Sequence, residues 1–259
     1  SCAPMILQRR GQIVELVKLT RSVRVSDLSE RFKVSEVTIR NDLIQLQKQG
    51  QLVRDHGGAL PLDHAHEITA LLAVEQRAHL QITEKQRIAR TAAALVRPGD
   101  TILMDAGTTV VEMVPHLATI TPLTIVTNAF NVALEVSTKT KAKIILLGGN
   151  YNQESSSTLG PITEQTLNEF VVQKAFLGAQ ALDLKLGITD TTLEIAQIKR
   201  AMIKAARTAI LLADSSKFGQ SGFIKVAPLT GMQTIVTDSG LPNDIRSALE
   251  ALDIKVLTV

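Results

Sequence analysis

The sequence predicts an α/β protein with a small helical domain at its N-terminus and a larger domain built on a mostly parallel sheet. Three helical patterns follow one another closely within the first sixty residues. From Thr83 onward, short continuous apolar runs alternate with helical segments, as expected for strands covered on both faces. The 259-residue chain is 45% hydrophobic, enough for real cores. We expect domains over residues 1–60 and 83–259, joined by a linker over residues 61–82.

Composition narrows the possible functions. Aromatic residues make up only 3% of the chain, so few side chains are available to bind bases or sugars by stacking. The single cysteine, Cys2, leaves no disulfide framework and no multi-thiolate metal site. No apolar run reaches membrane-spanning length, and the first residues lack the apolar core of a signal peptide. We therefore expect a cytoplasmic protein with no membrane partner and no cofactor.

Positive charge is concentrated at the N-terminal end. Residues 1–60 contain ten Lys or Arg against six Asp or Glu, a net charge of +4. Because the whole chain carries +3, residues 61–259 have a net charge of −1. This distribution either arises by chance or indicates that the first domain meets a polyanion.

The first three helical patterns are arranged as a helix-turn-helix. The first covers roughly residues 8–19, with Ile13 and Val17 on one face. Ser26 is the expected N-cap of the second helix, and Ser35 is the expected N-cap of the third. Two capped helices separated by a tight turn are typical of a helix-turn-helix.

The third helix has one apolar face and one polar face. A 100° step per residue places Ile39, Leu43 and Leu46 on the buried side. The opposite side is suited to the major groove, where Asn reads adenine, Arg reads guanine or a phosphate, and Val methyls contact thymine. The residues of this region that we expect to contact DNA are Ser35, Val37, Thr38, Arg40, Asn41 and Lys48.

The segment after this helix predicts a basic hairpin. Gly50 ends the helix, an extended segment starts at Leu52, and a Gly-Gly pair permits a tight turn. A hairpin after a recognition helix is a wing, which reaches phosphates or the neighbouring minor groove. The wing residues expected to contact DNA are Arg54, His56 and Gly57. The alternative is a three-helix unit that serves only as a protein contact.

The stretch VSDLSERFKVSEVTIRNDLIQLQKQGQLVRDHGGAL resembles the winged helix of the DeoR-type bacterial transcriptional regulators. Those regulators carry VSxxTIRRDLxxLexxGxLxRxHGGA at the same spacing. This chain departs from the pattern at Asn41, where many members have a second Arg. Because Asn41 is expected on the outward face, the DNA sites read by those members need not be read here.

The larger domain is expected to begin with a helix and then to alternate strands with helices. Thr83 and Gln86 predict a capping box at the head of that helix, and a Pro-Gly turn leads into the strand TILM at residues 101–104. The further apolar runs that predict strands lie at residues 123–126, 143–147, 174–179, 209–213, 234–237 and 254–259.

Polar and glycine-rich sequences follow several of these strands, at the ends where an open α/β sheet binds its ligands. In DAGTTV, the Gly and Thr residues would lie at a helix N-terminus that suits an anionic group such as phosphate. Lys217 adds a cation, while Asp105 and Asn128 are suited to hydrogen-bond hydroxyls. Together they fit a phosphorylated, hydroxyl-rich small molecule. Each feature alone has a plainer explanation as a helix cap, a surface turn or a solvated acid.

The order of these motifs resembles the C-terminal sensor of the same DeoR-type family. DxGTT, TN, GG, an isolated Glu and DSSKF occur in this order in both. The resemblance implies a domain similar to ribose-5-phosphate isomerase and glucosamine-phosphate deaminases, controlled by a phosphorylated sugar or a related metabolite. The effector-site residues that it implies are Asp105, Gly107, Thr108, Thr109, Thr127, Asn128, Gly148, Gly149, Glu194 and Lys217. The segment around Glu194 is the loosest match, because the Asn often found beside that Glu is absent.

The leading hypothesis is a repressor of a carbohydrate-utilisation operon, with no catalytic residues, that binds double-stranded operator DNA as a dimer or tetramer. The alternative is a sugar-phosphate isomerase-like enzyme with an appended DNA-binding module, in which Glu194 or Asp105 is the general base. A nucleotide-binding module has less support, because the chain contains neither G-x-G-x-x-G nor a Walker A sequence. We expect no metal site, because His64, His66 and His79 lack a partner cluster at ligand spacing.

Overall fold

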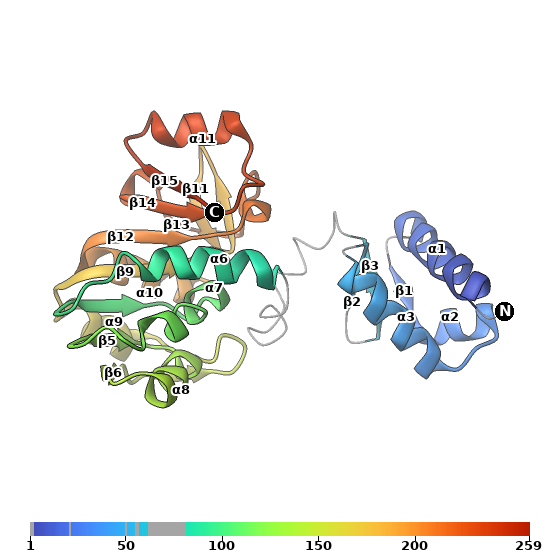
Figure 1. Cartoon of the computed structure of the whole chain (residues 1–259), viewed down its shortest axis with the longest axis horizontal. Helices are drawn as coiled ribbons and strands as arrows, with labels where there is room; N and C mark the ends of the chain where they lie inside the picture. The colour runs from blue at the N-terminus through green and yellow to red at the C-terminus, as the bar shows by residue number, and fades with distance from the viewer. Residues whose placement is uncertain (1–2, 21, 50, 55–56, 62–80) are drawn as a thin grey trace. The chain divides into compact units, whose positions relative to one another are not determined.

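The computed structural model describes residues 3–20, 22–49, 51–54, 57–61 and 81–259 (Figure 1). The chain forms two compact units, Ser1–Thr69 and Ala70–Val259. The expected linker, with its three histidines, lies outside the described residues except at its two ends. Among the described residues, no helix has the length and apolar character needed to cross a membrane.

In its described residues, the N-terminal unit contains three helices and a small antiparallel sheet. The helices are α1 (Ala3–Thr20), α2 (Val25–Phe32) and α3 (Glu36–Lys48). The strands are β1 (Val23–Arg24), β2 (Val53–Arg54) and β3 (Gly58–Leu60), in the order β1-β3-β2. The β2–β3 hairpin is the wing expected from the sequence. It pairs through β3 with β1, so it is tied to the segment that leads into α2.

One cap in this unit was predicted correctly and one was not. Ser35 caps α3, because its hydroxyl accepts a hydrogen bond of 3.2 Å from the Thr38 N–H. Ser26 is not the cap of α2, which already begins at Val25. The Val25 N–H donates to the Gly57 carbonyl of the wing at 2.8 Å, so a tertiary contact satisfies the helix end that a side chain was expected to cap.

The core of the N-terminal unit is formed by the apolar faces of all three helices. Ile39, Leu43 and Leu46 of α3 are fully buried, together with Ile13 of α1 and Leu28 of α2. Burying a side chain of this size contributes roughly 1.5–3 kcal/mol. The apolar side of α3 is therefore fixed against its neighbours, which leaves its opposite side available.

The C-terminal unit is built on a seven-stranded sheet in which every neighbouring pair is parallel. All seven apolar runs identified in the sequence form its strands, which confirms the α/β prediction. In sheet order the strands are β15 (Lys255–Thr258), β14 (Thr234–Thr237), β12 (Ala206–Leu212), β9 (Val172–Gly178), β4 (Thr101–Met104), β5 (Thr124–Thr127) and β6 (Lys143–Leu146).

Helices cover both faces of this sheet. One face packs Ile88 and Val132 against Ile102, and the other packs Met202 against Leu103. The helices are α6 (Ile82–Ala93), α7 (Thr108–Val111), α8 (Phe130–Lys139), α9 (Pro161–Asn168), α10 (Leu193–Ala205) and α11 (Asn243–Glu250), with short 3-10 turns η2 (Val114–Leu117), η3 (Ser215–Lys217) and η4 (Leu229–Gly231).

The expected capping box at the head of α6 is wrong. Thr83 and Gln86 both lie inside the helix, which begins at Ile82. Gln81 is in the left-handed conformation, with φ of 51°, and its carbonyl accepts the first intrahelical hydrogen bond, 3.0 Å from the Lys85 N–H. The sequence pattern located the helix but placed its start two residues late.

Two small sheets extend the C-terminal unit, and neither was visible as an apolar run. β7 (Asn150–Asn152) and β8 (Ser157–Leu159) form a hairpin after β6. β10 (Ala181–Asp183), β11 (Gly187–Asp190) and β13 (Ile224–Ala227) form an antiparallel sheet that continues from the end of β9. Both small sheets start at the carboxyl ends of strands of the large sheet, where the candidate ligand residues are found.

The strand order reverses beside β4. From β4 the chain proceeds through β5 to β6 on one side, and then crosses to β9, β12, β14 and β15 on the other. In open α/β sheets, ligands bind at such a reversal, outside the carboxyl ends of the two central strands. Here those ends are Asp105, which follows β4, and Gly178, the last residue of β9.

A candidate nucleic-acid interface and a candidate ligand site

The outward face of α3 is exposed as its periodicity predicts. Val37 is 64% exposed, and Arg40 and Asn41 are exposed beside it. An exposed Val next to exposed hydrogen-bonding side chains is the composition that reads base edges in a major groove. Lys48 is the last residue of α3, and the structure does not describe its side chain.

Two of the expected DNA contacts also hold the start of α3 in place. Ser35 caps the helix, and its hydroxyl lies 2.9 Å from the Thr38 hydroxyl. A hydroxyl in such a cap retains acceptor capacity. Ser35 and Thr38 therefore fix the end of the helix that the hypothesis places in the groove.

Glu36 is a member of this face that sequence reasoning missed. Its carboxylate oxygen Oε2 lies 2.7 Å from Nη2 of Arg40, and both side chains are about half exposed. The i,i+4 spacing of Glu36 and Arg40 was the available signal. The pair therefore puts a negative charge beside Arg40 on the outward face of α3.

We expect Glu36→Gln to raise affinity for random-sequence DNA several-fold and to raise affinity for the operator less. The substitution removes a carboxylate that repels phosphates and removes the ion pair that neutralises Arg40. Fluorescence anisotropy with an operator duplex and a random duplex measures the ratio of the two affinities. Glu30→Gln, at an exposed acid of α2, is the matched control. An unchanged ratio, or the same change in both variants, would contradict this role.

The wing places a half-buried Arg54 on β2, and Gly57 and Gly58 lead into and begin β3. His56 lies outside the described residues. Gly57 is exposed, and its carbonyl anchors the start of α2. A Cβ at Gly58 would lie 1.7 Å from the Val23 carbonyl oxygen, so this second glycine lets β3 approach β1.

Asp105 lies at the reversal of strand order in the C-terminal unit and joins the two central strands. Its carboxylate oxygen Oδ1 accepts from the Ala106 N–H at 2.8 Å. Its other oxygen, Oδ2, accepts from the Gly178 N–H at 3.0 Å. The carboxylate predicted from the sequence is therefore buried and oriented by one backbone donor after β4 and one at the end of β9.

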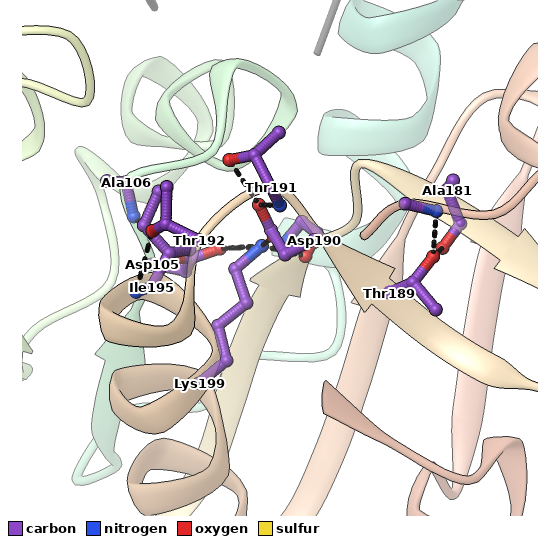
Figure 2. Close-up of polar contacts among 11 residues, drawn as sticks. Asp105, Ala106, Ala181, Thr189, Asp190, Thr191, Thr192, Ile195 and Lys199 are labelled. Carbon is purple, nitrogen blue, oxygen red and sulfur yellow. Dashed lines mark hydrogen bonds and ion pairs between the residues drawn. The ribbon is translucent and has the colours of Figure 1, made fainter. Parts of the chain in front are cut away.

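Lys199 of α10 completes a buried charged cluster with Asp105 and Asp190 (Figure 2). The Lys199 Nζ lies 2.8 Å from Asp190 Oδ2 and 3.4 Å from Asp105 Oδ2. It also donates to the Gly178 carbonyl at 2.8 Å. All three charged residues are less than a tenth exposed, and two carboxylates face one ammonium group.

Asp190 and Lys199 were missed by sequence reasoning. Asp190 ends the short strand β11, and Lys199 lies in the middle of the amphipathic helix α10. In the sequence, the adjacent Lys199 and Arg200 suggest a solvent-exposed side of a helix, although only Arg200 is exposed. The available signal was position: Lys199 shares a helical ridge with the buried Ala196 and Met202.

The two residues predicted at the carboxyl end of β5 are buried and contact the protein itself. The Thr127 hydroxyl donates to the Met104 carbonyl at 2.6 Å. The Asn128 amide Nδ2 donates to the Thr158 carbonyl at 2.8 Å and so anchors the β7–β8 hairpin. The Asn128 Oδ1 atom is buried and has no hydrogen-bond partner in the described structure. An acceptor left in this way is suited to a hydroxyl donor.

Gly148 and Gly149 follow β6 and pack against Thr163 of α9. The Thr163 hydroxyl donates to the Gly148 carbonyl at 2.7 Å. Gly149 has φ of +149°, and a Cβ there would lie 2.0 Å from the Thr163 Oγ1 atom. Close packing of the turn against α9 therefore requires Gly149.

The DAGTTV segment forms a turn and the four-residue helix α7. Gly107 is the residue before this helix, and Thr108 and Thr109 begin it with largely buried side chains. A Cβ at Gly107 would lie 3.3 Å from the Gly178 Cα atom. Gly107 thus lets the end of β4 approach the end of β9.

Glu194 and Lys217 differ from this buried group. Glu194 is exposed in the first turn of α10, and at five residues before Lys199 it points to a different side of the helix. Lys217 is half-buried in η3, at the carboxyl end of β12. Asp238, which follows β14, accepts from the Ser215 N–H at 2.6 Å and holds this turn at the sheet edge.

The structure therefore gathers most of the predicted ligand residues along one edge of the sheet. The ends of β4, β5 and β6 are adjacent in register, while η3 lies beyond β9 on the other side of the reversal. Glu194 lies in the first turn of α10 and does not follow a strand of the large sheet. Among the described residues, no group of three His, Cys, Asp or Glu has the arrangement of a metal site.

Comparison with known protein families gives matches to both units. A model of the DeoR-like helix-turn-helix domain matches residues 9–64. A model of the DeoR C terminal sensor domain matches residues 80–239. The two matches correspond to the helical unit and to the unit built on the parallel sheet.

Full-length relatives are found among bacterial regulators. The uncharacterized HTH-type transcriptional regulator YulB of Bacillus subtilis is 37% identical, with 98% of this chain and 97% of the relative covered. The glycerol-3-phosphate regulon repressor of Escherichia coli is 32% identical, with 93% and 94% covered. Among solved structures, ribose 5-phosphate isomerase A from Methanocaldococcus jannaschii aligns at 17% identity and a TM-score of 0.39, covering 52% of this chain and 53% of that one. That likeness concerns the fold alone.

Proposed function

Because the chain belongs to the DeoR family of helix-turn-helix transcriptional regulators, we propose that it represses a carbohydrate-utilisation operon under the control of a phosphorylated sugar. The family assigns DNA binding to the helix-turn-helix and a small-molecule effector to the sensor domain. The relatives are regulators rather than enzymes, so the isomerase-like alternative loses its support. We assign DNA binding to residues 1–60 and effector binding to residues 83–259.

The observation that carries the DNA-binding part of this proposal is the two-sided character of α3. Ile39 and Leu43 are fully buried, while Val37, Arg40 and Asn41 are exposed on the opposite side. The buried face of such a helix packs against the core. The exposed face, here called the reading face (Val37, Arg40 and Asn41), can enter a major groove. Because one winged helix supplies few base contacts, we propose that the protein binds its operator as a dimer or tetramer.

The charges at the sheet edge favour one orientation of the effector. Asp105 and Asp190 outnumber Lys199 in the buried cluster, so a phosphate beside Asp105 would be repelled. We place the hydroxyls of the effector at Asp105 and Asn128, where acceptors are available. We place its phosphate toward Lys217, the cation at the carboxyl end of β12.

The effector proposal is tested with the full chain and its operator DNA. The operator is selected from a random duplex pool, and its retention in a gel-shift assay is followed as pentose and hexose phosphates are added. At least one phosphorylated sugar should change operator affinity by about tenfold or more, and the matching unphosphorylated sugar should not. Equal effects of both forms, or no effect of any sugar phosphate, would contradict the proposal.

Replacing Lys217 by Ala should weaken the effector response without weakening operator binding. Loss of a hydrogen bond to a charged group corresponds to about tenfold to a hundredfold in the effector concentration required. The measurement is the midpoint of the effector titration in the gel-shift assay, together with operator affinity in the absence of effector. Lys204→Ala, at an exposed position in the last turn of α10, is the control. Equal losses of operator binding and effector response would identify Lys217 as a structural residue.

A further inference from the structure

A buried carboxylate joins the first helix to the recognition helix. Asp42 of α3 is only 2% exposed, although it directly follows the exposed Asn41. The Nε atom of Arg9 lies 2.6 Å from Asp42 Oδ2, and the Nε atom of Arg10 lies 2.8 Å from Oδ1. Both arginines belong to α1, so one carboxylate holds two neighbouring guanidinium groups.

This group of three residues carries more positive than negative charge. Two guanidinium groups face one carboxylate, which leaves a net charge of +1. Within the described residues, each guanidinium donates only through Nε, so four of its five N–H donors remain. The side chains of Arg9 and Arg10 are 14% and 23% exposed. A charge held in place with unused donors is suited to bind an anion.

The position of Asp42 places this group along the edge of the reading face. On a helix, residue 42 has residues 39 and 46 on one side and residues 38 and 45 on the side toward residue 41. Ile39 and Leu46 are buried, whereas Thr38 is partly accessible and Gln45 is exposed, so Asp42 lies between the core face of α3 and the side that carries Asn41. When that side enters a groove, the anions that meet its edge are the phosphates of the flanking DNA strand.

We propose that Arg9 and Arg10, held by Asp42, bind a phosphate of the DNA backbone that flanks the groove entered by α3. The inference rests on the DNA-binding function of the helix-turn-helix. Asp42 is the positioning residue, because it aligns two like charges that would otherwise repel each other. The contact sets the depth and register of α3 and carries no sequence information of its own.

The test compares the full chain with its Arg10→Gln variant on two duplexes of equal length. One duplex carries the operator selected from a random pool by the unaltered chain, and the other has a scrambled sequence. Affinities are measured at several salt concentrations. The variant should lose the same factor on both duplexes, about threefold to tenfold, and the slope of log K against log salt should become shallower by about 0.9, the value of one phosphate.

Two further variants separate the phosphate contact from other effects. Arg31→Gln removes one exposed charge in the last turn of α2 and should leave the salt slope nearly unchanged. Arg10→Lys keeps the charge but not the fork of donors, so it should keep the slope and lose affinity equally on both duplexes. If Arg10→Gln fails to fold, Arg10→Lys decides the question, and its wild-type affinity would overturn the proposal.

The possible failures can be told apart. An unchanged slope in a folded Arg10→Gln variant, or a loss confined to the operator duplex, overturns the phosphate contact alone. If the unaltered chain selects no duplex from the pool, the DNA-binding function itself is contradicted.

Discussion

Replacing Lys199 with Met should destabilise the C-terminal unit by about 3–5 kcal/mol, because it leaves two buried carboxylates without their cation. Asp105 and Asp190 are each 5% exposed, and the Lys199 Nζ is the ammonium group that lies between them. A unit of this size loses roughly 2–4 °C in melting temperature per kcal/mol. The thermal transition of the sensor unit, followed in the full chain, should therefore fall by about 6–20 °C.

Lys174→Met is the matched control for this prediction. The Lys174 Nζ lies 2.6 Å from Asp100 Oδ2, but both side chains are more exposed than those of the Lys199 cluster. Asp100 keeps the hydrogen bond from the Arg97 N–H and is more accessible to water, so the loss should be smaller than in Lys199→Met. A second substitution, Asp190→Asn, should recover part of the stability lost in Lys199→Met. Equal losses in the two lysine variants would show that the buried cluster is not a strong stabilising element.

The parallel sheet could be predicted because its strands are buried on both faces. Continuous apolar runs such as those that became β4 and β12 leave little alternative once helices separate them. The same reasoning located Asp105 at the carboxyl end of a strand. Whether Asp105 and the other predicted residues bind an effector stays a prediction, which the experiments above address.

The start of a helix was predicted well only where a local contact determines it. Ser35 caps α3 through its own hydroxyl, three residues from its partner, and this spacing is visible in the sequence. The start of α2 depends on the Gly57 carbonyl, which lies 32 residues from Val25 along the chain. A donor satisfied from so far away leaves no pattern near Ser26.

The buried cluster was missed for the same physical reason. Lys199 contacts residues that lie on β11 and at the ends of β4 and β9, and these segments meet only in the folded sheet. In the sequence, Lys199 stands beside an exposed Arg and resembles a solvated helix residue. Glu194, which the family resemblance favoured, is by contrast exposed. Charge pairing across a fold therefore has to be found in three dimensions.

Replacing Arg40 with Ala should weaken binding to the operator by about tenfold to a hundredfold, the range expected for a side chain that contacts a base edge bidentately. Arg40 is exposed on the reading face, and Glu36 holds its guanidinium at 2.7 Å. The loss should be much smaller on a scrambled duplex, because the base that Arg40 is expected to contact is absent from that duplex. The measurement is the ratio of operator to scrambled affinity at one fixed salt concentration.

Arg54→Ala supplies the contrast that makes this prediction specific. Arg54 lies on the wing, where side chains reach the backbone and the minor groove, so its loss should weaken operator and scrambled duplexes by similar factors. Selectivity should therefore fall in Arg40→Ala and stay nearly constant in Arg54→Ala. The double variant should abolish operator retention in a gel-shift assay while the thermal transition is kept. Full operator binding in both single variants would show that DNA is not read by this side of α3.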